Sequence, residues 1–354
     1  MSDENKEVAL NKPCLVSLVE GKKYAWCTCK QSKTQPFCDG SHKGTDLKPL
    51  VFKADKDEDV LLCTCKATAS GPYCDGAHNN LEDEYAEASA EEVESMKNSV
   101  FVPRDHGEFG KALIDGGAYV LSPDDANNKT AGNLNYQPVI AEVDGATKLS
   151  LHRMVLSRGT SPWLQYKGVD TVLYIVDGTG TIDIAGKEFQ VAKETGIYVR
   201  PGEAFRIITD NNMTIFAAVC PMLTDLTILD DNTATFQADY PERVVAFDLA
   251  TANVMANRFY QELVDKKVGS NEVTQFIGEV PLSRAAMHRH LYEEAIVILH
   301  GFGRMWTGKK WAEVKLGDVI FLPHRQGHSV ECTDKNGMRL MGVFYPSGSP
   351  AINY

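Results

Sequence analysis

The sequence has no apolar stretch long enough to cross a membrane and no excess of basic residues. Its 36 Lys and Arg are outnumbered by 48 Asp and Glu, which gives a net charge of −12. A nucleic-acid-binding protein needs a basic patch, so this charge argues against nucleic acid as a partner. Residues 1–13 are polar and charged and do not resemble a secretory signal. These absences predict a cytoplasmic protein that binds neither nucleic acid nor membranes.

Helical periodicity is scarce after residue 99. Short runs of alternating apolar residues are separated by Gly, Pro, Asn and Asp, with a spacing near 8–12 residues. Examples are Thr171–Val176, Gly180–Ile184, Phe189–Val191 and Ile197–Val199. This pattern is typical of an all-β sandwich or barrel, so a mainly β fold is predicted. A less regular, partly helical bridge is expected around Val254–Lys267.

Cysteine is concentrated in two copies of one pattern, C-x-C-x8-C-x3-H. The potential ligands are Cys27, Cys29, Cys38 and His42 in the first copy and Cys63, Cys65, Cys74 and His78 in the second. C-x-C places two sulfurs on one face of an extended segment, and C-x3-H places two ligands on one face of a helical turn. Backbone N–H groups at the Asp-Gly pair within C-x3-H are expected to hydrogen-bond to sulfur. Thiolate and imidazole together suit an iron–sulfur cluster or zinc, and the spacing leaves both open.

Both copies resemble the CDGSH iron–sulfur family, over roughly residues 12–80. Cys38–His42 spells the family motif in full, Ala77 replaces its serine in the second copy, and Pro36 and Pro72 stand two residues before the third cysteine. The resemblance implies a [2Fe–2S] cluster held by three Cys and one His in each copy, and therefore two clusters per chain. An imidazole in place of a thiolate should raise the reduction potential and make it depend on pH.

An acidic segment follows the cysteine patterns. Residues 81–98 contain seven acids and one base, and their apolar residues fall roughly on one helical stripe. An amphipathic helical linker is therefore predicted. The predicted domains are a cluster domain at 1–80, this linker at 81–98, a first β domain at 99–235 and a second at 236–354.

The β pattern occurs twice, at about residues 145–222 and 272–346. Gly178 and Gly180 of the first copy align with Gly301 and Gly303 of the second. The aligned segments resemble the conserved motifs of the cupin superfamily, and the region at roughly 105–346 resembles a bicupin. The resemblance implies two jelly-roll β-barrels.

Only the second copy keeps the metal ligands that cupin motifs imply. His288, His290 and Glu294 fit the first motif, and His328 fits the second, in which Arg325 replaces the usual glycine. H-x-H on a strand would point both imidazoles into the barrel. The set predicts one mononuclear metal with two positions open for substrate or dioxygen. It suits Fe, Mn, Ni, Cu or Zn better than Mg or Ca, and Fe(II) is the metal we expect.

The first copy has lost these ligands. Gln165, Lys167 and Thr171 stand at the positions of the first motif, and Arg206 replaces the last histidine. None of these side chains is a good ligand for a transition metal. The first copy is therefore predicted to be a scaffold, with an anion pocket at Lys167 and Arg206 as the second possibility.

Arg284 is the candidate catalytic residue. Strand alternation would place it on the same face as His288, where its guanidinium could hold a substrate carboxylate through two hydrogen bonds. The alternative is that the strand ends first and Arg284 reaches solvent. The first option predicts a small, anionic substrate.

A redox cluster fused to an open metal site predicts a cytoplasmic non-haem iron oxygenase, by analogy with Rieske oxygenases. An external reductase would supply electrons through the clusters to the iron. A homo-oligomer is expected, because bicupins and single-motif cluster proteins both associate. Two alternatives stay open. One is a metal-dependent bicupin hydrolase, similar to ureidoglycine aminohydrolase, with structural or regulatory clusters. The other is a sensor of redox state or iron.

Overall fold

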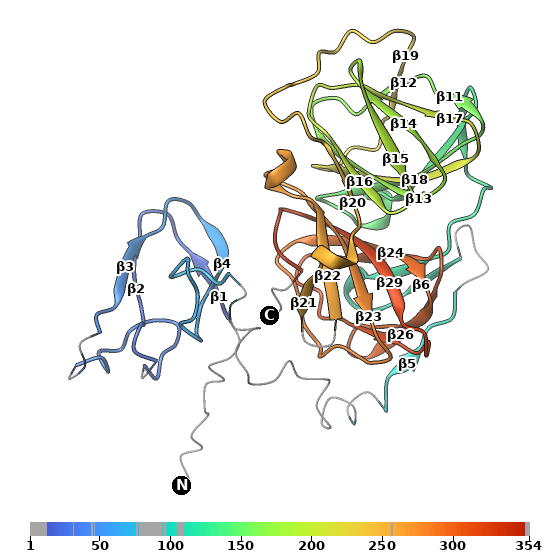
Figure 1. Cartoon of the computed structure of the whole chain (residues 1–354). Helices are drawn as coiled ribbons and strands as arrows, with labels where there is room; N and C mark the ends of the chain where they lie inside the picture. Colours follow the sequence, from blue (N-terminus) through green and yellow to red (C-terminus); the bar gives the residue numbers. More distant parts are fainter. Residues whose placement is uncertain are drawn as a thin grey trace. The chain divides into compact units, whose positions relative to one another are not determined.

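The computed structural model of the 354-residue chain describes residues 13–30, 32–43, 45, 47–75, 77, 94, 97–104, 110–255 and 258–350 (Figure 1). One compact unit is built mainly from the N-terminal residues up to Ala86, and the other comprises Glu87–Met287 and Tyr292–Gly348. The predicted linker helix lies outside the described residues, apart from Glu94, Lys97 and Asn98. The described part of the chain has no helix that is long and apolar enough to cross a membrane. The fold is mainly β, as predicted.

The N-terminal unit interleaves its two repeats. Strand β1 (Cys14–Leu18) pairs with β4 (Glu58–Leu62), and β2 (Lys23–Trp26) pairs with β3 (Leu50–Lys53), both antiparallel. Strands β1 and β2 precede the first cysteine pattern, and β3 and β4 precede the second. Each two-stranded sheet therefore takes one strand from each repeat, so that the repeats fold as one unit.

The larger unit contains two pairs of sheets, which we call the first and second β sandwich (Figure 1). The sheets of the first sandwich have the orders β20-β16-β13-β18-β10-β9-β8 and β15-β14-β17-β12-β19, with β11 paired to β17. The strands are β8 (Lys129–Ala131), β9 (Leu134–Ile140), β10 (Ser150–Leu156), β11 (Gly159–Thr160), β12 (Trp163–Gln165), β13 (Asp170–Asp177), β14 (Thr179–Ile184), β15 (Lys187–Ala192), β16 (Thr195–Val199), β17 (Phe205–Thr209), β18 (Met213–Cys220), β19 (Thr227–Leu229) and β20 (Val244–Ala246). The four strands predicted from alternation correspond to β13–β16.

The second β sandwich has sheets in the orders β21-β22-β23-β29-β24-β27-β7-β6 and β28-β25-β26-β5. Its strands are β5 (Val100–Phe101), β6 (Lys111–Leu113), β7 (Tyr119–Leu121), β21 (Asn253–Met255), β22 (Arg258–Val264), β23 (Thr274–Val280), β24 (Glu293–His300), β25 (Phe302–Trp306), β26 (Lys310–Lys315), β27 (Val319–Leu322), β28 (Ser329–Cys332) and β29 (Met338–Tyr345). Short 3-10 turns are η2 (Asp115–Gly117), η3 (Glu142–Asp144), η4 (Leu249–Thr251) and η5 (Lys266–Val268).

Two details differ from the sequence-based expectations. The bridge at Val254–Lys267, predicted to be partly helical, is mainly strand: β21 pairs with β22 and β22 pairs with β23, and the 3-10 turn η5 begins at Lys266. Strand pairing also crosses the predicted boundary between the two β domains, at residues 235 and 236. Strand β7, from the predicted first domain, joins β27 of the second sandwich, and β20, from the predicted second domain, joins β16 of the first. These pairings join segments far apart in the sequence, which local patterns do not reveal.

Central strands are apolar on both faces because each face meets a different core. On β24, Ala295 and Val297 enter a core shared with the first sandwich, whereas Ile296 and Ile298 enter the core of the second sandwich alone. A strand that is buried on both sides reads as a continuous apolar run. The two sandwiches are thus joined by one hydrophobic core.

The aligned glycines occupy equivalent positions in the two sandwiches. A Cβ atom on Gly180 would lie 2.2 Å from the backbone oxygen of Ile208, and one on Gly303 would lie 1.9 Å from that of Glu331. Only glycine allows neighbouring backbones to approach this closely. The equivalence confirms the sequence alignment of the two copies.

Candidate metal centres

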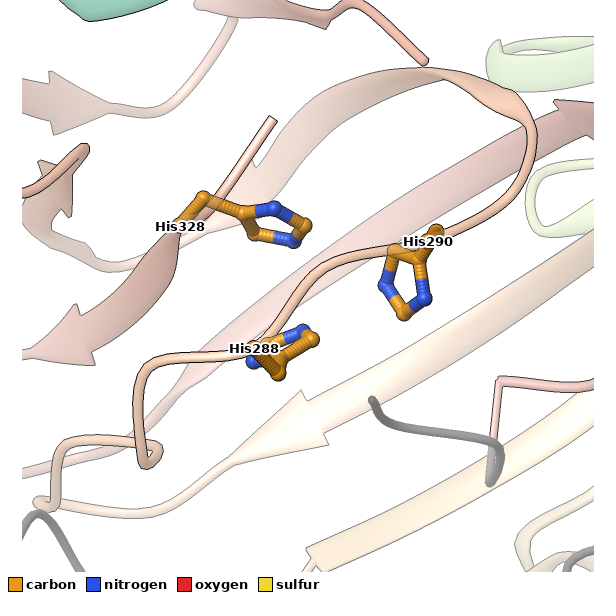
Figure 2. Close-up of side chains that lie close together, drawn as sticks. All are labelled: His288, His290 and His328. Carbon is orange, nitrogen blue, oxygen red and sulfur yellow. The ribbon is translucent and has the colours of Figure 1, made fainter. Parts of the chain in front are cut away.

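Three histidines converge in the second sandwich (Figure 2). One ring nitrogen from each of His288, His290 and His328 lies within 4.8 Å of the other two. In the described ranges this is the one such group of three or more His, Cys, Asp or Glu. His290 and His328 are buried, and His288 is half-buried.

His288 and His290 lie on an irregular segment between β23 and β24, so the prediction that H-x-H sits on a strand is wrong. Pro281 follows β23 directly and has no N–H group to continue a strand ladder. Beyond it, Arg284 forms an isolated bridge with Glu331 and lies outside any named strand. The two imidazoles still come together, with ring centroids 4.9 Å apart at 68°.

The loop before β28 presents His328. Its Nδ1 donates to the backbone oxygen of Gln326 at 2.9 Å. A carbonyl can only accept, so this contact places the proton of the neutral ring on Nδ1 and leaves Nε2 able to bind a metal. Arg325 has a φ of 65°, which explains why the cupin motif usually has glycine there.

Glu294 supplies a carboxylate beside the ring of His328. It is the second residue of β24, and its Oε2 lies 3.9 Å from Nε2 of His328. Burial raises the pKa of Glu294 from 4.5 to about 8. A metal cation would favour the ionised form and offset this cost. Three imidazoles and a carboxylate are a donor set that transition metals bind, so these residues fit the predicted mononuclear ion.

The neighbouring Glu293 precedes the glutamate of the cupin motif, and the structure shows what it contacts. Its carboxylate accepts backbone N–H groups of Thr147 at 2.9 Å, Lys148 at 2.7 Å and Leu149 at 3.3 Å. The Thr147 hydroxyl also donates to it, at 2.6 Å. Glu293 therefore anchors the start of β24, next to Glu294, to the loop before β10. No local sequence signal identifies such a long-range anchor.

Arg284 contacts an aromatic side chain. Its guanidinium carbon lies 4.7 Å from the ring centroid of Trp306, whose Nε1 donates to Glu331 at 2.8 Å. Arg284 was expected to share a strand face with His288, but no named strand contains the two residues. Its role as a carboxylate-binding residue stays a prediction.

The first sandwich directs the corresponding side chains to its own polar contacts. Gln165 donates to the backbone oxygen of Gly202 at 3.0 Å. Arg206 pairs with the buried Asp183 at 2.8 Å and lies over the ring of Trp163. An arginine charge that is already compensated is poorly suited to bind an anion, which argues against the anion pocket.

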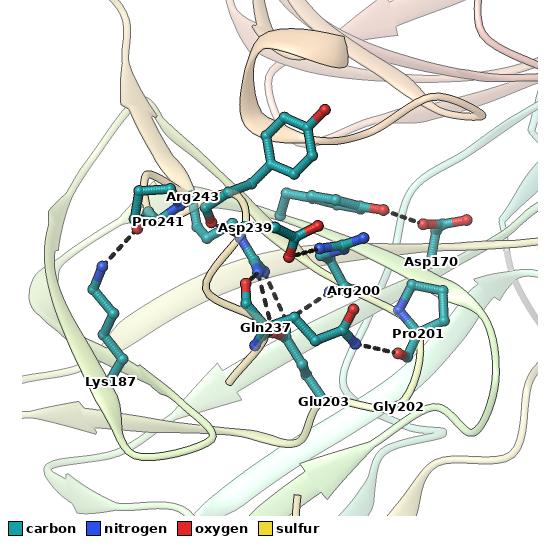
Figure 3. A network of polar contacts seen from close by, with 12 residues as sticks. Asp170, Lys187, Arg200, Pro201, Gly202, Glu203, Gln237, Asp239, Pro241 and Arg243 are labelled. Atoms are coloured by element: carbon teal, nitrogen blue, oxygen red, sulfur yellow. Dashed lines mark hydrogen bonds and ion pairs between the residues drawn. The ribbon is translucent and has the colours of Figure 1, made fainter. Parts of the chain in front are cut away.

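A buried ion pair holds the segment between β19 and β20 onto the rest of the first sandwich (Figure 3). Arg243 contacts both carboxylate oxygens of Glu203, at 2.7 and 3.1 Å, and both side chains are fully buried. Arg243 also donates to the backbone oxygen of Gln237, and the Gln237 side chain donates to that of Pro201 (Figure 3). This network fixes the segment between β19 and β20.

The N-terminal cysteines are arranged in pairs. The sulfurs of Cys27 and Cys29 are 3.7 Å apart, and those of Cys63 and Cys65 are 3.4 Å apart. Two thiolates on one tetrahedral metal with bonds of about 2.3 Å lie roughly 3.8 Å apart. Each C-x-C pair therefore has the separation expected of two ligands on one metal ion.

The remaining ligands of the first copy form a second pair, with Cys38 Sγ 3.1 Å from His42 Nδ1. A [2Fe–2S] cluster takes two ligands on each of its two irons. The two pairs of the first copy therefore suit such a cluster. In the second copy Cys74 is described, whereas His78 lies outside the described residues.

Backbone N–H groups point at the sulfurs, as predicted for Asp-Gly. The Gly40 N–H lies 3.4 Å from Cys38 Sγ, and the Lys66 N–H lies 3.1 Å from Cys63 Sγ. Such contacts stabilise negative charge on sulfur. The N-terminal unit thus supplies both the ligands and the donors that an iron–sulfur cluster needs.

Comparison with known proteins supports both regions. The family model described as iron-binding zinc finger CDGSH type matches residues 4–43, and the cupin domain model matches residues 280–344. The human mitochondrial CDGSH iron-sulfur domain-containing protein 3 is 61% identical over 49 residues, which are 13% of this chain and 39% of that protein. The mouse protein of the same name is 57% identical over 49 residues, 13% of this chain and 36% of that protein. The match spans about two fifths of the length of these curated relatives.

Solved structures resemble the two sandwiches. Protein Ylba from E. coli has a TM-score of 0.51 and 16% identity, covering 68% of this chain and 95% of Ylba. Bacillus subtilis oxalate decarboxylase has a TM-score of 0.51 and 14% identity, covering 65% and 78%. Brassica napus procruciferin, an 11S globulin, has a TM-score of 0.54 and 9% identity, covering 64% and 84%.

A decarboxylase and a globulin share this fold, so the fold alone does not decide the activity. At these identities the likeness shows a bicupin fold and nothing finer. The chain therefore combines an N-terminal CDGSH iron-binding domain with a cupin domain in which three histidines converge.

Proposed function

We propose that this protein is a metal-dependent oxidoreductase, specifically a non-haem iron oxygenase that acts on a small organic substrate. Electrons would reach the iron through the protein's own [2Fe–2S] clusters. One observation carries the proposal: the same chain contains paired Cys/His donors suited to a redox cluster and three converging imidazoles beside a buried carboxylate. A hydrolase or lyase does not need single electrons, whereas an enzyme that reduces dioxygen needs them one at a time.

The protein's own groups prepare the site for a metal. Gln326 holds the His328 ring with Nε2 available, and Glu293 anchors the strand that carries Glu294. Glu294 holds a proton near neutral pH in the metal-free protein and would release it when a cation binds. When bound, iron supplies Lewis acidity and one-electron chemistry with dioxygen, and the clusters supply the electrons.

The electron donor and substrate belong to the same proposal. An external reductase would reduce the clusters, which would pass the electrons on to the iron. The substrate would be a small organic molecule, and an anionic one if Arg284 binds a carboxylate. The protein would act as a homo-oligomer in the cytoplasm.

A second candidate is a metal-dependent cupin enzyme whose clusters are structural or regulatory. It is favoured by the comparison with Ylba, because 95% of that chain matches 68% of this one. Nearly the whole Ylba chain therefore corresponds to the bicupin region of this chain. On this reading the three-histidine site would work without electrons from the clusters.

Reductant-dependent dioxygen consumption separates the two candidates. Iron-loaded protein is supplied with photoreduced flavin and screened against small organic acids. The oxygenase proposal expects turnover in the wild type and its loss in both Cys38→Ser, which disrupts a cluster, and His288→Ala, which disrupts the metal site. Full substrate conversion by Cys38→Ser, with the metal still bound, would refute the oxygenase and support the second candidate.

A further inference from the structure

Lys66 occupies an unusual position in the N-terminal unit. It directly follows the second C-x-C pair, and its Nζ donates to the backbone oxygen of Cys63 at 2.8 Å. The same oxygen accepts a hydrogen bond from Nε1 of Trp26 at 2.7 Å. The ammonium also lies 4.4 Å from the centroid of the Trp26 ring. A residue just before the first C-x-C pair and a residue just after the second therefore meet at one ligand's carbonyl.

The ammonium contacts residues of both repeats. It binds the carbonyl of Cys63, a ligand of the second C-x-C pair, and it lies over the ring of Trp26, the residue before the first pair. One cation is therefore held where the two C-x-C segments meet. Lys66 is half-buried, so water screens its charge less than that of an exposed lysine.

The equivalent residue of the first repeat is Lys30. The two lysines share a left-handed backbone, with φ of 64° at Lys30 and 62° at Lys66. Lys30 is exposed, whereas Lys66 packs on Trp26. The position that corresponds to Trp26 in the second repeat is Leu62, which offers no aromatic face. The two lysines thus share a backbone conformation, but only the Lys66 ammonium is held against an aromatic ring.

We propose that Lys66 sets the reduction potentials of the N-terminal clusters by holding one positive charge against the Cys63 carbonyl and the Trp26 ring, where the two C-x-C segments meet. Reduction of a cluster takes one electron from a one-electron donor and adds one negative charge. A nearby cation in a partly desolvated site stabilises that added charge and raises the potential. The inference rests on the clusters of the proposed function and is independent of the cupin activity.

The test is a redox titration of the full chain, followed by visible absorption and EPR, with dithionite and mediators as the reductant. In Lys66→Gln, which removes the charge and keeps a hydrogen-bond donor, we expect reduction of at least one cluster to become about tenfold less favourable, a fall of about 59 mV. Lys30→Gln, the matched exposed change, should shift the midpoints by less than half of that. Lys66→Arg, which keeps the charge, should stay close to wild type.

Equal midpoints in Lys66→Gln and Lys30→Gln would overturn the proposal. The oxidised visible spectrum shows beforehand whether each variant retains its clusters. If Lys66→Gln loses them, Lys66→Met is titrated in its place, and loss of clusters in both would assign Lys66 a structural role and overturn the proposal. If the wild type has no cluster spectrum, the proposed function fails at its first step, an outcome distinct from unchanged midpoints.

Discussion

Replacement of Glu294 by glutamine should stabilise the metal-free protein. The carboxyl group is fully buried, and burial raises its pKa from 4.5 to about 8. In the unfolded chain the group ionises freely, whereas the folded chain must keep it protonated or bury a charge. The folded state therefore binds this proton more tightly, so the contribution of Glu294 to stability is greatest below pH 4.5 and falls as the pH rises toward 8.

The size of the effect follows from proton linkage. Between those two pKa values the folded state holds one more proton than the unfolded state, and the free energy of unfolding falls by about 1.4 kcal/mol for each pH unit. Glutamine does not titrate. Between about pH 5.5 and about pH 7.5, the advantage of Glu294→Gln over wild type should therefore grow by about 3 kcal/mol.

Urea unfolding of chelator-treated protein, followed by the fluorescence of Trp306 and Trp311 in the second sandwich, measures this advantage. Added Fe(II) should reverse the order, because the variant loses a metal ligand. Glu293→Gln is the matched control, since its carboxylate accepts several N–H groups. It should destabilise by about 1–3 kcal/mol at both pH values. An advantage of Glu294→Gln that does not change with pH would refute the reasoning.

Metal content, buried charge and strand packing provide the remaining tests. His328→Ala should remove the mononuclear metal but keep the visible cluster absorption, whereas Gln165→Ala should change neither; metal retained in His328→Ala would contradict the assignment. Glu203→Gln leaves the buried Arg243 without its anion. The free energy of unfolding, measured in urea, should fall by about 3–5 kcal/mol. A cost below about 1 kcal/mol would show that the pair is dispensable. Gly303→Ala would place a Cβ atom 1.9 Å from a backbone oxygen, so it should lower the free energy of unfolding by at least about 1–3 kcal/mol. Gly278→Ala, where the nearest atom is 3.4 Å away, should cost clearly less.

The fold class and the ligand types were predictable because their signals are local. Alternation of apolar residues gave the strands, and two short spacings gave the cysteine and histidine sets. The paired arrangement of Cys27 with Cys29, and of Cys38 with His42, required coordinates. The wording of the motif favoured an iron–sulfur cluster over zinc, and these paired distances agree with a cluster of two irons.

The errors came from pairing between distant segments. His288 was expected on a strand, but a strand needs a partner along its length, and the chain after Pro281 has only isolated pairing there. Val254–Lys267 lacks clear alternation, yet β23 recruits part of it as β22, because tertiary pairing overrides weak local preference. The anchoring of Glu293 by Thr147 and Lys148 has no local signal either.

Electron flow from the clusters to the cupin metal is the central claim, and stopped-flow spectroscopy tests it most directly. Protein is reduced anaerobically, freed of reductant and mixed with dioxygen while the cluster absorption is followed. The account predicts that clusters of the iron-loaded wild type re-oxidise faster than those of His290→Ala, which keeps its clusters and loses the metal. Equal rates in the two proteins would contradict the account.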